Sequence, residues 1–166
     1  MNDASAPDAS TRETVAAQLR RSQAQVGLAA LDHLDPAIVG RRPDGFEHSI
    51  WELVEHLRLA AEDLVDYVER DDYSAPAWPD DYWPAAPAPE GAERWNDSVA
   101  GFRQAIERMA KLVEDPARPL HDPVPTAEDP SHHLLRCALV LLDHNAYHLG
   151  QVVDLRRALG DWPPGR

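Results

Sequence analysis

Two histidines stand four residues apart in the segment LLDHNAYHLGQVVDLRRALG, which spans residues 141–160. The segment has the pattern of one helix, and side chains at i and i+4 lie one turn apart, so the rings of His144 and His148 can converge on one ion. Each residue advances about 100° around a helix, which places His148 on the apolar stripe and His144 at its edge. Because an unpaired buried polar group costs about 1–3 kcal/mol, buried imidazoles need partners. The pattern favours either a metal site or histidines that form hydrogen bonds inside the core.

A third metal ligand is available on a second apolar stripe. His56, in the stretch WELVEHL, lies at the border of that stripe. Three histidines would leave coordination positions open for water or substrate, as in catalytic sites, and imidazole ligands suit Zn, Ni, Co or Fe. Nearby polar side chains are candidates for hydrogen bonds that fix the ring orientations. These candidates are Glu52, Glu55, Asn145 and Gln151.

Other reactive side chains are weaker candidates. His48 lies two turns before His56, too far to share an ion if both are helical, and we interpret it as a capping or pocket residue. His48 and Glu52 are also candidates for proton transfer. Cys137, the single cysteine, is interpreted as a small buried hydrophobe rather than as a nucleophile.

The positions of the prolines indicate the elements that carry these residues. Proline breaks helix interiors, and the 15 prolines leave four long proline-free stretches, each with a helical apolar pattern. The expected helices span about residues 11–34, 50–70, 91–114 and 132–159. Four amphipathic helices of similar length, without a clear strand pattern, predict an all-α fold with the architecture of a four-helix bundle.

Capping patterns mark three of the helix starts. Ser10 and Glu13 have the spacing of a capping box, and so do Ser49 and Glu52. Ser131, which follows a proline, is the expected N-cap of the last helix.

A long segment rich in proline and aromatic residues separates the second and third helices. Residues 71–90 read DDYSAPAWPDDYWPAAPAPE. An extended linker of this length reaches about 66 Å, whereas a helix of about 21 residues is about 32 Å long, so the linker could cross the whole bundle. The two flanking helices would then be parallel, in an up-down-down-up topology. We expect Trp78, Tyr82 and Trp83 to pin this crossover to the bundle, with a place at a pocket mouth as the alternative.

Length and charge narrow the classes of function. The chain has 166 residues, and we expect a disordered lead over residues 1–10 and a single domain over residues 11–166. The formal net charge of -13 makes nucleic acid and anionic membrane surfaces unfavourable partners. No apolar run approaches the roughly 20 residues of a membrane span, and the N-terminus has no signal-peptide pattern. These features predict a cytoplasmic protein and do not by themselves identify a function.

Three segments together resemble a known family. HSIWELVEHLRLAAEDLVDYV, WPDDYWP and LLDHNAYHLGQVVDLRRALG resemble the DinB-like (YfiT-like) superfamily of stress-associated four-helix bundles. The resemblance implies an up-down-down-up bundle, often a homodimer, that binds a divalent metal through three histidines. Carried over by motif, these ligands are His56, His144 and His148.

The resemblance also implies a range of activities. Better understood members are metal-dependent enzymes that use a low-molecular-weight thiol, such as mycothiol-dependent maleylpyruvate isomerases and bacillithiol transferases, and others are described as metal-dependent hydrolases. The leading hypothesis is a metal-dependent thiol S-transferase or hydrolase that acts on a small molecule. The alternatives are a non-catalytic module that binds a metal or small molecule, and a helical interaction domain whose histidines form hydrogen bonds in the core.

Overall fold

The computed structural model describes residues 5–21 and 28–162. These residues form four α-helices, two short 3-10 helices and no strand, which confirms the predicted all-α class. The elements are α1 (Ser5–Arg21), η1 (Leu28–Ala30), α2 (Ile50–Glu69), η2 (Asp80–Tyr82), α3 (Ala92–Glu114) and α4 (Leu134–Ala158). None of the helices in the described ranges is long and apolar enough to span a bilayer.

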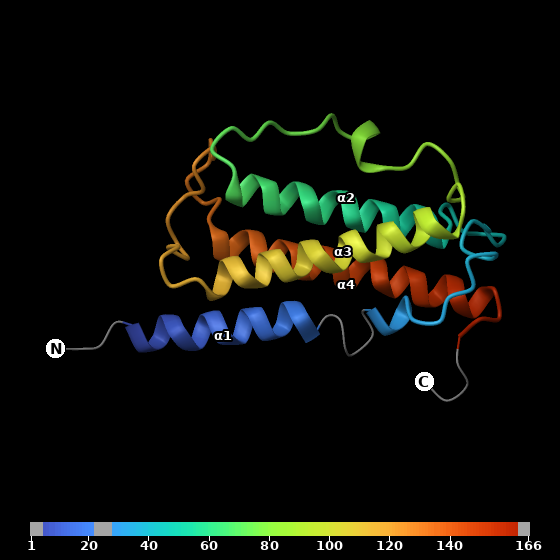
Figure 1. The fold of residues 1–166 in the computed structure, drawn as a ribbon, viewed down its shortest axis with the longest axis horizontal. Coiled ribbons are helices and arrows are strands. Elements are labelled where there is room, and N and C mark those ends of the chain that lie inside the picture. The colour runs from blue at the N-terminus through green and yellow to red at the C-terminus, as the bar shows by residue number, and fades with distance from the viewer. Residues whose placement is uncertain (1–4, 22–27, 163–166) are drawn as a thin grey trace.

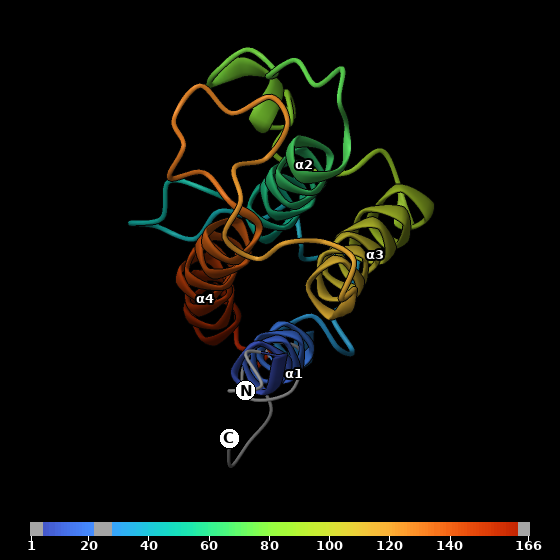
Figure 2. The same ribbon diagram turned by 90° about the vertical axis from the view of Figure 1, so that its left-hand side faces the viewer.

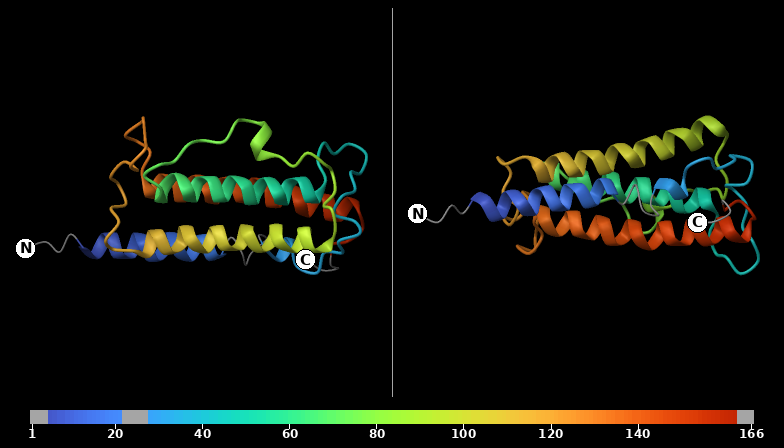
Figure 3. Two further views of the ribbon diagram at one scale, coloured as in Figure 1. Left: turned by 45° about the horizontal axis from the view of Figure 1, so that its top comes forward. Right: turned by 90° about the horizontal axis from the view of Figure 1, so that it is seen from below.

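The α-helices pack as a four-helix bundle with α1 diagonally opposite α2 (Figure 2). Helices α1 and α4 run in one direction, whereas α2 and α3 run in the other (Figure 1, Figure 3). This is the predicted up-down-down-up topology. The crossover, which we define as residues 70–91, returns along the outside of α2 from one end of the bundle to the other (Figure 1).

The predicted bounds of the last three α-helices agree with the structure to within two residues. The expected first helix, residues 11–34, is wrong at both ends, because α1 begins at Ser5 and ends at Arg21. Residues 22–27 lie outside the described residues, and η1 follows them. The guanidinium of Arg156, which is 1% exposed, donates hydrogen bonds to the carbonyls of Ala30 and Asp32. This tertiary contact binds carbonyls that a continuing α-helix would use itself, so it favours a turn there.

Of the three predicted caps, the second is confirmed. Ser49 Oγ accepts a hydrogen bond from the Glu52 amide at 3.2 Å, and the Glu52 carboxylate accepts one from the Ser49 amide at 2.8 Å. Ser10 is not a cap, because α1 already begins at Ser5. The N-cap of α4 is His133 rather than Ser131, since an antiparallel bridge to Pro123 holds His133 in an extended conformation.

The crossover is attached to α2 by side chains of both segments. The phenols of Tyr73 and Tyr82 each donate a hydrogen bond of 2.7 Å to the Asp63 carboxylate, one to each oxygen. The ring of Trp83 is half-buried and stacks on His56, whereas Trp78 is 71% exposed. Tyr82 and Trp83 therefore pin the crossover as predicted, and Trp78 does not.

A buried arginine joins α1 to the end of α3. Arg12 is 7% exposed and donates hydrogen bonds to the carbonyls of Val113, Asp115 and Arg118. The last carbonyls of a helix lack partners within it, so the guanidinium satisfies groups that would otherwise remain unpaired.

A buried carboxylate holds the parallel helices α2 and α3 together. Glu55 on α2 is 3% exposed and accepts hydrogen bonds from Arg58 on the same helix, at 2.6 and 2.9 Å, and from Arg94 on α3. Burial alone would raise the pKa of Glu55, but the hydrogen bonds from Arg58 and Ser98 and the charges of Arg58 and Arg94 together outweigh burial, and the pKa is lowered. Glu55 therefore fixes the turn of α2 that also carries His56.

Replacing this carboxylate should change how stability depends on pH. We expect Glu55→Gln to lower the free energy of unfolding by about 1–3 kcal/mol near neutral pH. Because folding lowers the pKa of Glu55, its contribution is present above the unfolded value of about 4.3 and is lost as the pH falls through the folded value. Urea unfolding over a series of pH values should therefore give a shallower acid decline for the variant than for the wild type.

Glu62→Gln is the matched control for this experiment. Glu62 also pairs with Arg58, but its side chain is 36% exposed, so its removal should cost at most about 1 kcal/mol. Identical acid declines for the wild type and Glu55→Gln would contradict the role given to Glu55.

Candidate metal centre

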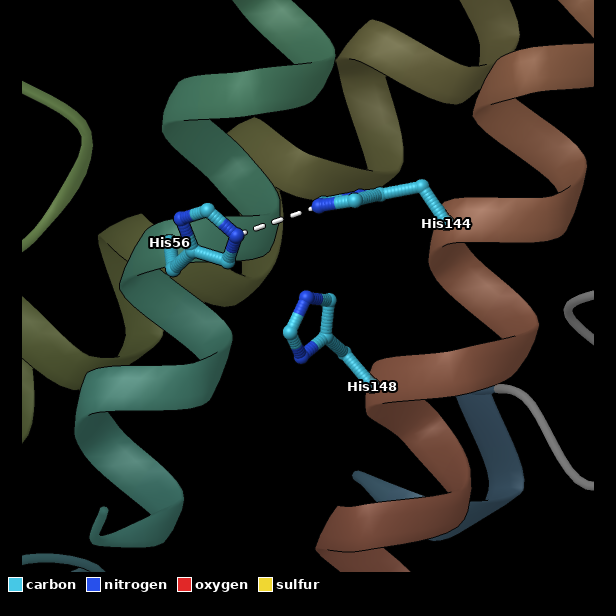
Figure 4. A group of neighbouring side chains, drawn as sticks. All are labelled: His56, His144 and His148. Carbon is cyan, nitrogen blue, oxygen red and sulfur yellow. Dashed lines mark hydrogen bonds between the residues drawn. The ribbon is translucent and has the colours of Figure 1, made fainter. Parts of the chain in front are cut away.

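Three histidines from two helices converge on one point inside the bundle (Figure 4). His56 comes from α2, and His144 and His148 come from consecutive turns of α4. One ring nitrogen of each lies within 4.8 Å of the other two. The Nε2 atoms of His56 and His144 are 3.1 Å apart. The structure thus brings together the three residues that the sequence singled out.

Hydrogen bonds on the far side of two rings fix their orientation. His56 Nδ1 donates to the backbone carbonyl of Tyr82 at 2.8 Å, and His148 Nδ1 donates to the side-chain carbonyl of Gln151 at 2.8 Å. A carbonyl can only accept, so in these two neutral rings the proton is on Nδ1 and the Nε2 lone pair is free. Both free lone pairs belong to the convergent cluster.

The spacing of the cluster suits a metal ion. In a tetrahedral zinc site with Zn–N distances of about 2.0 Å, two ligand nitrogens lie about 3.3 Å apart. The separation of 3.1 Å between His56 and His144 is close to this value. Without a metal, a proton on His144 Nε2 could be donated to the Nε2 lone pair of His56. The Nε2 lone pair of His148 would then have no donor from this proton. The three histidines could therefore hold a metal ion.

All three rings are neutral at physiological pH, which is the form that binds metals. Burial lowers the pKa of His144 to about 4, with further lowering from the neighbouring His148 and His56. Burial also lowers the pKa of His56 and of His148, against the hydrogen bonds that these rings donate to Tyr82 and Gln151, which act in the opposite direction. A metal ion would thus displace few protons from the cluster.

Trp83 covers the outer face of His56. The two rings are parallel within 1° and their centroids lie 4.0 Å apart, and the ring of His48 stacks on the Trp83 ring with centroids 4.4 Å apart. His48 is therefore one layer away from the cluster and does not belong to it.

The other candidates have different surroundings. The Glu52 carboxylate is bound by Arg42 and by the Ser49 amide, and these hydrogen bonds outweigh burial and lower its pKa. Gln151 holds a ring as predicted, whereas Glu55 is bound by arginines instead. Asn145 is fully buried, and its amide forms no hydrogen bond within the described part of the chain. Neither Glu52 nor Glu55 is part of the histidine cluster.

Sequence reasoning missed the carbonyl of Tyr82 as a partner of His56. A backbone carbonyl has no side-chain signature, so only the aromatic residues around it could have indicated that this part of the crossover lies against α2. Cys137 is buried, as predicted, and burial raises the pKa of its thiol.

A cavity of about 700 Å³ reaches His144 from the outer face of α4. Its lining includes Leu139, Val140 and Tyr147, which are 43–65% exposed, together with Arg136. No crossover residue lines this cavity, whereas two other cavities are lined partly by the crossover. His144 is the member of the cluster that lines the cavity along α4.

The structure is an up-down-down-up helical bundle with a cluster of histidines from two helices. Comparison with known families identifies the family of this bundle. The model of the DinB superfamily matches residues 18–152, which is most of the sequence. The chain belongs to the DinB superfamily. No curated protein and no solved structure matches it.

Proposed function

We propose that this protein binds one divalent metal through the Nε2 atoms of His56, His144 and His148, and uses it in an enzyme reaction on a small molecule. The proposal depends on one observation, the convergence within 4.8 Å of ring nitrogens from two buried histidines, His56 and His148, and the half-buried His144. Neutral rings held by Tyr82 and Gln151 support it. The metals proposed first are Zn and Ni, with Co and Fe as further options, since imidazole suits all four.

The proposed reaction is a thiol-dependent S-transfer or a hydrolysis. A bound divalent metal supplies Lewis acidity, which lowers the pKa of a coordinated thiol or water. The three histidines would leave a coordination position for that ligand. Trp83 covers one side of the site, and the cavity along α4 would admit the substrate beside His144. His48 and Glu52 remain the candidates for proton transfer.

A non-catalytic binding module is the alternative. It would use the same three histidines to sequester or sense a metal or small molecule. A purely structural role would instead leave the 3.1 Å contact between His56 and His144 as a hydrogen bond in the core. A homodimer, a cytoplasmic location and the use of a low-molecular-weight thiol are further parts of the proposal that follow from the family and the composition.

Elemental analysis of protein purified without a histidine tag tests the metal site. We expect about one divalent ion per chain, and its loss from both His56→Ala and His148→Ala, because each variant removes a ligand from a different helix. His121→Ala is the control, since His121 is exposed in a loop and lies outside the cluster. If no metal binds even after incubation with Zn or Ni, the three histidines are core residues and the proposal fails.

The variant Gln151→Leu tests whether the hydrogen bond between His148 and Gln151 contributes to metal affinity. The substitution removes the acceptor that orients His148, so metal affinity should fall by about 10- to 100-fold while the stoichiometry is unchanged. Gln104→Leu makes the same change at an exposed position of α3 and should leave affinity unaltered. Competition with a chelating dye measures both. Equal affinities for the two variants would show that the hydrogen bond from His148 does not orient the ligand.

Activity assays distinguish the proposed enzyme from the alternative, a non-catalytic binding module. The metal-loaded wild type should be active with either a thiol and an electrophilic substrate or a hydrolysable ester, and activity should follow metal occupancy across His56→Ala, His148→Ala and His121→Ala. Full occupancy without turnover in either assay would favour the binding module.

A further inference from the structure

A second cavity lies at the other end of α2 from the histidine cluster. It has a volume of about 630 Å³ and is enclosed by α2, the start of the crossover and the loop between α3 and α4. Tyr67 in its wall follows His56 by about 16 Å along the helix axis. The rim residues Glu128 and Asp129 are exposed, so the cavity is reached from solvent. It shares no lining residue with the cavity at His144.

Two tyrosine rings form the aromatic part of its wall. Tyr67 and Tyr73 meet at an angle of 64° with centroids 5.0 Å apart, and Leu64 and Ala75 complete the apolar lining. Both phenols have partners, since Tyr73 donates to Asp63 and Tyr67 shares a hydrogen bond of 2.9 Å with Nδ1 of His132. The rings are thereby held in place, and both contribute to the wall of the cavity.

The lining has three carboxylates and one basic side chain, His132, whose Nε2 lies 4.0 Å from Asp129. Asp63, Glu128 and Asp129 line it, and no lysine or arginine does. Arg136, which acts electrostatically on Tyr67 and on Asp129, lies outside the lining. By contrast, the neighbouring acidic cavity on the other side of the crossover contains Arg70. An anion would be repelled here, and a neutral ligand would gain nothing from the three carboxylates.

The acidic side chains do not form a metal site. Apart from the three histidines at the candidate metal centre, no group of three potential ligands converges within the described residues. A metal ion needs several oxygen atoms at about 2.0–2.6 Å, whereas carboxylates spread around an aromatic wall suit a larger cation of diffuse charge.

We propose that this cavity binds an organic cation, either a quaternary ammonium or a protonated amine, between the Tyr67 and Tyr73 rings and the carboxylates of Asp63, Glu128 and Asp129. The tyrosine faces attract the cation through their quadrupoles, and the carboxylates supply the complementary charge. The site is separate from the proposed metal centre and does not depend on it.

Choline and its neutral analogue 3,3-dimethylbutan-1-ol provide the test. They have nearly the same shape and differ in charge, so calorimetric titration of the full-length protein at physiological salt should give saturable binding of choline and about tenfold weaker binding of the alcohol. The same titration with His148→Ala should give unchanged choline binding, which keeps the result independent of the metal proposal.

A pair of variants at Tyr73 locates the site. Tyr73→Phe and Tyr73→Leu both remove the hydrogen bond to Asp63, but only the leucine variant removes the aromatic face. Choline affinity should stay within about threefold of the wild type in Tyr73→Phe and fall by about tenfold in Tyr73→Leu. Three results would each overturn the proposal: no saturable choline binding at millimolar concentrations, equal affinity for the neutral alcohol, or wild-type affinity in Tyr73→Leu.

Discussion

The hydrogen bond from His56 Nδ1 to the carbonyl of Tyr82 is the contact on which the candidate metal centre most depends. It directs the free lone pair of His56 toward α4, and it exists only because the crossover lies along α2. Trp83 follows Tyr82 directly and stacks on the same imidazole, so consecutive residues of the crossover fix both the rotation and the plane of the ring. The ring orientation is therefore determined by a segment outside the bundle core.

The topology explains why such a segment is present. A parallel pair, α2 and α3, cannot be joined by a short turn, because the chain must return along the full length of the bundle before it starts the next helix. The return path passes the outer face of α2, where Asp63 accepts hydrogen bonds from Tyr73 and Tyr82. The same constraint that lengthens the connection thus supplies the carbonyl for His56 and one wall of the tyrosine-lined cavity.

The sequence predicted those features whose cause is local. Helical periodicity and the Ser49 capping box place α2 and its histidine, and the i, i+4 spacing places His144 and His148 on one face. The turn that replaces the expected helix around residues 30–32 could not be predicted, because the guanidinium of Arg156, which binds the carbonyls of Ala30 and Asp32, is distant in sequence. The role of Tyr82 was hidden for a related reason, since the atom involved is a backbone carbonyl that every residue possesses.

Placing three imidazoles together costs free energy, because their polar ring nitrogens need partners. Hydrogen bonds within the folded chain offset only part of this cost. Burial keeps the imidazoles neutral and two Nδ1 protons have acceptors, but three Nε2 atoms share one small volume. One proton on His144 can satisfy the lone pair of His56 and no other. A cation satisfies all three at once, and a ligand that binds only the folded state adds its binding free energy to the stability of the fold. A metal would therefore stabilise this bundle by pairing the ring nitrogens that face one another in the cluster.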